Sequence, residues 1–321
     1  MNFDLSEDQH TIKRTAREFL ASRYKPEEVR RLALEDERGW TDAQWAEMAE
    51  LGWPQLVHPE HGLGTVELVV VAEELGYALA PTPLQSTWMA GLALAAGGQS
   101  ARLEGRRGAL AVWPGDAPGE WIAVPDAGTA DVLVLRDPGG GASVTEDFSV
   151  EPAPGIDPTR RLFTVRASGG KPLEGDLSRA WDQILVMSAA ESVGVGERAM
   201  HMAVAYAKER KQFGRAIGSF QAVSHPCAQM LLEVEGARSA VYWAAWALDF
   251  EPETGPLAAA CAKAYASDAG ARVTRSAMQV HGGIAFTWEH DLHFLLKRAE
   301  ANAHALGEAR SLRARVAALT L

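Results

Sequence analysis

The sequence predicts an α+β protein that is mainly helical, with an N-terminal helical domain, a short middle β-domain and a C-terminal four-helix bundle. Three observations support this fold class. Apolar residues recur at helical spacing over roughly the first hundred residues. A segment rich in Gly, Pro and Val follows, in which turn clusters separate short apolar runs. Helical spacing then returns. We therefore place the domains at 1–105, 106–172 and 173–321.

The N-terminal domain is expected to be a series of helices. Ser6 and Thr41 are predicted N-caps, because a hydroxyl oxygen at this position can accept a backbone N–H of the first turn. Pro26 is expected to begin the second helix, since proline is tolerated at the first helical position. Longer apolar helices are predicted at 66–76 and 84–96.

The middle domain is expected to be an antiparallel β-domain of short strands. Clusters of turn-forming residues bound each apolar run, and residues 137–141 are the clearest of these clusters. The predicted strands are 109–113, 121–124, 131–135 and 162–165.

The C-terminal domain is predicted to contain four long helices, because the helical period continues over almost all of it. Gly214 interrupts the pattern after the first helix, and Gly282-Gly283 interrupts it before the last. The predicted helices are 178–210, 217–249, 256–280 and 288–319.

Composition limits the classes of function. The chain has 321 residues, 47% of them hydrophobic, so it can bury a sizeable core. A formal charge of −11 argues against a nucleic-acid-binding surface. Cys227 and Cys261 form no CxxC pair, which fits a reducing compartment and gives no metal-binding signature. The first residues do not form a signal peptide, and Glu73-Glu74 break the apolar stretch around them. We therefore expect a cytoplasmic protein without a membrane span.

The strongest chemical signal lies in residues 205–222. Arg210, Lys211 and Arg215 bracket a break at Gly214 between two helices. A cationic turn that contains glycine suits an anionic ligand such as a pyrophosphate. A plain helix–helix corner with solvated charges is the alternative interpretation.

This stretch resembles the signature of the acyl-CoA dehydrogenase superfamily. The resemblance is carried by residues 210–214 (RKQFG), by Ile217 and by Phe220-Gln221. Residues 279–283 (QVHGG) are similar to the family's Gln-x-x-Gly-Gly turn. Weaker similarities to the family lie at 3–9, 51–53, 59–60 and 73–76.

The resemblance implies a FAD-dependent enzyme that desaturates an acyl-CoA thioester between its α and β carbons, or a subunit of one. It also implies a role in lipid or steroid catabolism, a homo- or hetero-tetramer, and an electron acceptor such as an electron-transfer flavoprotein. In the family, these motifs reach across a subunit interface to the FAD of a neighbour. The implied FAD contacts are Arg210, Phe213, Gln221, Gln279, Gly282 and Gly283.

The glycine pair supports this interpretation independently. Gly282-Gly283 lets the backbone approach a ligand closely, and the following helix can direct its N-terminal amides at a phosphate. The alternative is a helix C-cap followed by a turn, with His281 as a structural histidine.

The catalytic base expected from the family is missing from both of its usual places. The family uses a glutamate for α-proton abstraction, and the two corresponding positions here hold Ile184 and Leu306. The nearest carboxylates, Glu191 and Glu308, are therefore the candidate bases. Glu191 lies seven residues after Ile184 and so shares a helix face with it. A salt bridge in a helix-packing contact or an interface is the alternative role for Glu191. The C-terminal helix also has Arg298 where the family has an aspartate.

The β-domain departs from the family as well. It lacks the Thr-Glu-Pro and Gly-Ser-Asp segments that hold the flavin ring, and it is short. This pattern resembles the small subunits of heterotetrameric (α2β2) acyl-CoA dehydrogenases, such as those of steroid side-chain degradation. Two hypotheses follow. The chain is a catalytic flavoenzyme with a displaced base, or it is a non-catalytic subunit that completes the FAD site of a partner.

Overall fold

The computed structural model describes residues 4–321, so Phe3 of the first similarity lies outside the described residues. The chain divides into two compact units. One comprises residues 4–26, Val69–Ala80 and Leu185–Leu321, and is called the bundle unit below. The other comprises Glu27–Leu68 and Pro81–Ile184, and is called the sheet unit. The three domain boundaries given above stay a prediction.

Long helices make up most of the bundle unit. α8 packs against α7 along its length and also against α9 and α10. Helices α4 and α6 each begin in the sheet unit and end in this one. The helices are α1 (Glu7–Arg23), α4 (Thr65–Ala78), α6 (Ser178–Glu209), α7 (Gln221–Phe250), α8 (Gly255–His281), α9 (Leu292–His304) and α10 (Ala309–Thr320), with the 3₁₀ helices η5 (Ile217–Ser219) and η6 (Gly282–Phe286) between them.

Two glycines bring α4 and α6 into backbone contact within the bundle unit. A Cβ added to Gly194 would lie 1.9 Å from the carbonyl oxygen of Glu73. A Cβ added to Gly76 would lie 2.2 Å from the carbonyl oxygen of Glu191. Because glycine has no Cβ, the backbones of the two helices can approach this closely, and any other residue at either position would clash.

Ion pairs hold α1 and α7 to this helix pair. The buried Glu73 accepts hydrogen bonds from Lys13 Nζ at 2.9 Å, Arg238 Nε at 3.0 Å and the Tyr242 hydroxyl at 2.8 Å. Burial alone would raise the pKa of Glu73, but the charges of Lys13 and Arg238 outweigh it and hold the pKa below its ordinary value. Arg17 also forms an ion pair with the buried Glu74, but burial outweighs the charge of Arg17 there and raises the pKa of Glu74. These contacts fix the N-terminal helix to the bundle.

The sheet unit contains shorter helices and eight strands. The helices are α2 (Pro26–Leu34), α3 (Asp42–Glu50) and α5 (Leu84–Ala96), with the 3₁₀ helices η1 (Trp53–Gln55), η2 (Pro59–His61), η3 (Ser100–Leu103) and η4 (Ala127–Thr129). The strands are β1 (Gly108–Ala111), β2 (Trp113–Pro114), β3 (Glu120–Pro125), β4 (Val132–Arg136), β5 (Ala142–Thr145), β6 (Ser149–Ala153), β7 (Leu162–Arg166) and β8 (Lys171–Pro172).

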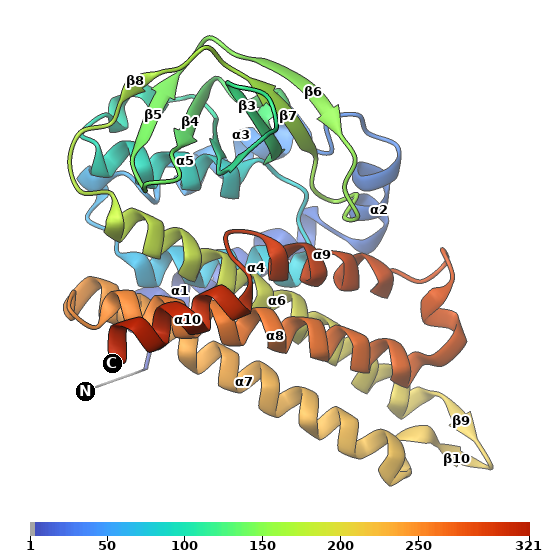
Figure 1. Ribbon diagram of the computed structural model, residues 1–321. Helices are drawn as coiled ribbons and strands as arrows, with labels where there is room; N and C mark the ends of the chain where they lie inside the picture. The colour runs from blue at the N-terminus through green and yellow to red at the C-terminus, as the bar shows by residue number, and fades with distance from the viewer. Residues whose placement is uncertain (1–3) are drawn as a thin grey trace. The chain divides into compact units, whose positions relative to one another are not determined.

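The strands form two four-stranded sheets, ordered β1-β4-β5-β8 and β2-β3-β7-β6. One buried cluster of small and branched side chains draws on strands of both sheets. Helix α5 packs against β1 and β4 and is buried from Leu84 to Leu94. Figure 1 shows it lying beneath the strands. A helix that is buried on all sides has no solvent-facing polar stripe, which explains why α5 is mainly apolar around its whole circumference.

The mainly helical α+β fold class is confirmed, and so are both predicted N-caps. Ser6 and Thr41 each accept the backbone N–H of the third helical residue at 3.2 Å and form a capping box. Helix α5 begins and ends at the predicted residues. Among the described residues, none of the helices is both long enough and apolar enough to cross a membrane.

Two expectations are wrong. The β-domain is not wholly antiparallel, because β1 and β4 pair in parallel, Gly108 opposite Val132. The chain passes through β2 and β3 of the other sheet between them and so returns in the same direction. The last predicted helix is also broken. Leu306 and Gly307 have φ values of 63° and 118°, which a right-handed helix cannot contain, so α9 and α10 are separate.

We expect the Gly194→Ala variant to unfold at a lower temperature than the wild type. A methyl group would collide with the carbonyl of Glu73, and overpacking of this kind costs about 1–3 kcal/mol. Gly196→Ala is the matched control in the same helix, because its Cβ would meet its nearest neighbour at an ordinary 3.6 Å. Alanine there gains up to about 1 kcal/mol of helix propensity. Thermal unfolding followed by circular dichroism tests this, and equal midpoints for the two variants would contradict it.

Candidate functional site

A short hairpin occupies the centre of the first motif. Strands β9 (Lys211–Gln212) and β10 (Arg215–Ala216) pair antiparallel. Phe213 and Gly214 form the two-residue turn with φ values of 52° and 79°. A turn with positive φ at both central residues matches the twist of a hairpin, and glycine adopts it without strain. The predicted break between two helices is therefore an ordered β-hairpin.

The aromatic ring at the tip of this hairpin is open to solvent. Phe213 is 92% exposed, and its ring and that of Phe220 pack edge to face with centroids 6.2 Å apart. The guanidinium of Arg215 lies 4.0 Å from the Phe220 ring centroid. The hairpin thus presents a large apolar side chain away from its own unit.

Arg210 and Gln221 lie at the two ends of the hairpin segment. The Arg210 carbonyl accepts the N–H of Ile217 at 2.8 Å, which closes the hairpin onto the end of α6. The Arg210 side chain is exposed. Gln221 begins α7, and no side chain caps that helix end. The N–H groups of the α7 N-terminus therefore keep their partial positive charge.

The second motif forms the end of α8. Gln279 is exposed on the last turn, and Gly282 follows the helix with a φ of 66°. A Cβ added to Gly282 or to Gly283 would meet no atom within 4 Å. Open space therefore lies beside this stretch of backbone.

Stacked rings bring the two motifs together. The ring of His281 stacks on Tyr206, in the last turn of α6, with centroids 4.6 Å apart. The His290 ring meets the His281 ring edge-on, with centroids 4.7 Å apart. Burial lowers the pKa of His281, and its Nδ1 contacts the Ala277 carbonyl at 2.8 Å. Figure 1 shows the hairpin and the turn after α8 at the same end of the bundle unit. Neither Tyr206 nor His290 was among the predicted site residues.

Glu191, the first candidate base, lies in a buried ion pair. Its side chain is almost completely enclosed. Oε1 accepts a hydrogen bond from Arg298 Nη1 at 2.5 Å, and Oε2 accepts one from Asn302 Nδ2 at 2.9 Å. The buried Lys263 also donates to Ser188 Oγ at 3.0 Å and to the Asn302 carbonyl at 2.7 Å. This geometry matches the salt bridge that was the alternative role for Glu191.

The two positions where the family carries its base hold apolar side chains, and the second candidate base, Glu308, is exposed. Ile184 is buried, and Leu306 packs beside Leu185 and Leu312. Glu308 precedes the first turn of α10, with its Oε1 3.3 Å from His304 Nδ1. It lines an open cleft of about 430 Å³ whose walls carry mainly charged side chains of α8, α9 and α10. The catalytic roles of Glu191 and Glu308 stay predictions.

The polar groups of the bundle unit fall into two sets, one at its end and one in its core. One end of the bundle unit carries a cation, two side-chain amides, an uncapped helix N-terminus and open backbone, which together can bind an anionic ligand. The bundle core holds charges that satisfy one another. Within residues 4–321 no group of three or more His, Cys, Asp or Glu side chains could hold a metal ion.

Comparisons with known proteins point to one family. The profile for the acyl-CoA dehydrogenase C-terminal domain matches residues 185–320, and the profile for its N-terminal domain matches 6–102. The chain is 36% identical over 313 residues to the acyl-CoA dehydrogenase IpdE2 of Mycolicibacterium smegmatis, which covers 95% of this chain and 96% of that protein.

Solved structures agree on the fold. A chain of the Tcur3481-Tcur3483 steroid ACAD G363A variant superposes with a TM-score of 0.88 at 27% identity, covering 98% of this chain and 97% of that one. A chain of the ChsE4-ChsE5 complex from Mycobacterium tuberculosis also gives a TM-score of 0.88, at 24% identity, covering 99% and 98%.

We expect Arg298→Met to destabilise the chain strongly, because it leaves the Glu191 carboxylate buried without its cation. Breaking a buried ion pair in this way costs about 3–5 kcal/mol. Exchanging both partners, as Glu191→Leu with Arg298→Met, should recover much of that loss. The matched control is Arg38→Met, which breaks an exposed pair with Asp42 worth about 0–1 kcal/mol.

Thermal unfolding of these three variants gives the measurement. A midpoint for Arg298→Met no lower than that of Arg38→Met would show that the buried pair is not a structural element of the bundle.

Proposed function

This chain belongs to the acyl-CoA dehydrogenase family, and we propose that it is the subunit that completes a partner's FAD site without supplying the catalytic base. Membership makes it an acyl-CoA dehydrogenase or a subunit of one, with FAD as the cofactor. The observation that carries the finer assignment is the buried pair between Glu191 and Arg298.

The residues at the end of the bundle unit fit part of FAD. The pyrophosphate is anionic, and Arg210 offers it a side-chain cation that is exposed to solvent. The uncapped N-terminus of α7 offers further N–H donors. The backbone at Gly282 and Gly283 has open space beside it and no side chain, so the adenosine half of FAD can approach it closely. When bound, FAD takes up the β-hydrogen of the acyl group as hydride.

The exposed hairpin tip supports a cofactor held by another chain. Phe213 projects from its turn with almost its whole side chain in solvent. A phenylalanine in this position buries its ring only when something outside the unit covers it. We therefore assign Phe213, with Gln221 and Gln279, to the flavin of a neighbouring subunit.

The base assignment follows from the partners of each carboxylate. A general base must come within hydrogen-bond distance of the proton that it removes. Both oxygens of Glu191 are taken up by Arg298 and Asn302, and the side chain has almost no exposed surface. Glu308 does not lie in an enclosed pocket, because 66% of its side chain is exposed to solvent. We propose that a partner chain supplies the base and that Glu191 has a structural role.

The partner is proposed to be a second chain of the same family, in a tetramer. The 27% identical relative carries two chain names in its description, Tcur3481-Tcur3483, which supports a two-chain assembly. Its description as a steroid ACAD supports a steroid-derived acyl group on the CoA thioester. We propose a cytoplasmic protein that passes its electrons to an electron-transfer flavoprotein.

Arg210→Ala is expected to lower the affinity of the assembled complex for FAD. The variant loses a charge-assisted hydrogen bond to the pyrophosphate, which is worth about 1.5–3 kcal/mol, so affinity should fall roughly ten- to a hundredfold. Lys211→Ala removes a neighbouring exposed cation to which no FAD contact is assigned, and it should change the affinity much less.

Flavin retained after dialysis, measured by absorbance in the complex purified with its partner, gives the result. Equal retention by Arg210→Ala and Lys211→Ala would rule out the role assigned to Arg210.

A further inference from the structure

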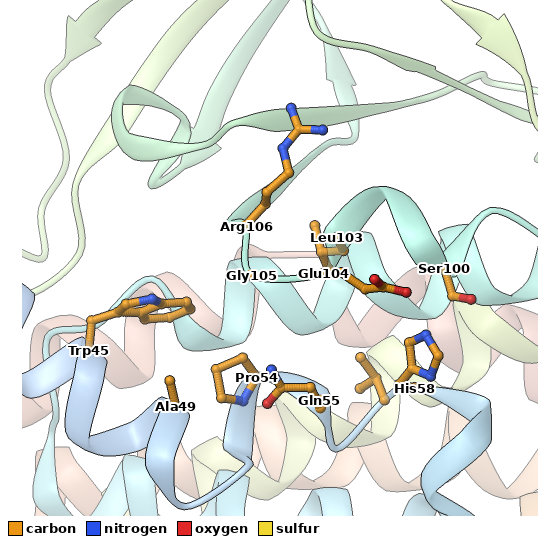
Figure 2. A pocket seen from close by; sticks show the side chains of 12 residues that line it. Trp45, Ala49, Pro54, Gln55, His58, Ser100, Leu103, Glu104, Gly105 and Arg106 are labelled. Atoms are coloured by element: carbon orange, nitrogen blue, oxygen red, sulfur yellow. The ribbon is translucent and has the colours of Figure 1, made fainter.

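A separate pocket of about 160 Å³ lies entirely within the sheet unit. Figure 2 shows Trp45, Ala49, Pro54 and Gln55 on one side of it and Leu103 with Glu104 on the other. Its walls come from α3, from η1 and the residues after it, from α5 at Gly91, and from η3 with the turn that follows.

Hydrogen bonds within the protein fix the positions of these walls. Trp88 Nε1 donates to the Trp53 carbonyl at 2.7 Å and so fixes η1 to α5. Arg106 donates to the carbonyls of Asp131 at 3.0 Å and Arg102 at 3.3 Å, which fixes the turn after η3. Figure 2 shows the Arg106 side chain directed away from the pocket. The pocket is therefore formed before any ligand enters, which lowers the cost of binding.

One buried donor in the wall has no partner in the protein. His58 Nδ1 accepts the backbone N–H of Glu60 at 3.4 Å, so the neutral ring carries its proton on Nε2. That Nε2 is buried and forms no hydrogen bond within residues 4–321. Leaving a buried donor unsatisfied is unfavourable, and a ligand that accepts its proton would remove this penalty.

An acceptor faces the same space. Glu104 lines the pocket, and Figure 2 shows the His58 ring beneath Glu104 and Ser100. Glu104 is exposed at the mouth of the pocket and forms no ion pair within residues 4–321, so solvent and not a cation of the protein faces its carboxylate. A ligand carboxylate would be repelled here, whereas a hydroxyl can accept from His58 and donate to Glu104 at once.

The size and the remaining walls define the rest of the ligand. Trp45, Pro54, Val57 and Leu103 give an apolar lining. A cavity of about 150 Å³ lined by apolar side chains holds benzene. We infer that this pocket binds a neutral six-membered-ring alcohol, with phenol as the simplest example. This inference goes beyond the proposed function and does not depend on it.

The test is a calorimetric titration of the full-length chain with phenol, toluene and benzoate. Phenol should bind with saturation, and benzoate should bind more weakly. His58→Phe removes the donor and should weaken phenol roughly three- to tenfold while toluene is unchanged. His58→Gln keeps an N–H donor and should preserve most of the phenol affinity. Ala49→Leu fills the pocket and should abolish binding of both neutral rings.

His10→Phe is the matched control, because His10 is an exposed histidine outside the sheet unit, and it should bind all three compounds like the wild type. Three results would overturn the inference. Phenol could show no saturable binding, which would leave water as the occupant of the pocket. His58→Phe could bind phenol as tightly as the wild type, or benzoate could bind as tightly as phenol.

Discussion

The ion pair between Glu191 and Arg298 is the interaction on which the core of the bundle unit depends. It joins α6 to α9 between two side chains that are both buried. Charges in such a place are tolerated only when they are paired and their remaining hydrogen-bonding atoms are satisfied, and Asn302 satisfies the second oxygen. The same pairing occupies Glu191, the candidate base that shares a helix face with Ile184. In the proposed function, one contact therefore both stabilises the bundle core and removes Glu191 as a candidate base.

The position of α6 connects this core to the proposed cofactor site. Close glycine contacts hold one face of the helix to α4, and the ion pair holds it to α9. Its last turn carries Tyr206, which stacks on His281 at the end of α8. Both motifs that we propose to contact FAD begin within a few residues of these two rings. The packed ends of α6 and α8 therefore position Arg210 and Gln279, while Phe213 at the hairpin tip is exposed.

Local chemistry explains what could be predicted from the sequence. The caps at Ser6 and Thr41 depend on residues three apart, and the bounds of α5 depend on Pro and Gly beside it. The parallel pairing of β1 with β4 depends on contacts far apart in the chain, and so does the partner of Glu191, 107 residues away. An arginine at position 298, where the family has an aspartate, was the one signal of a buried carboxylate partner. The turn at Leu306 was missed because leucine rarely adopts positive φ.

The most direct test of the account is turnover of Glu191→Gln and Glu308→Gln, each in a complex with an unchanged partner. Dehydrogenation of an acyl-CoA thioester is measured with an artificial electron acceptor, and the rate is normalised to bound flavin. If a partner chain supplies the base, both variants keep the wild-type rate per flavin. Removing a true general base costs at least about a hundredfold in rate. A loss of that size in either variant, with flavin still bound, would contradict the account and identify this chain as the base donor.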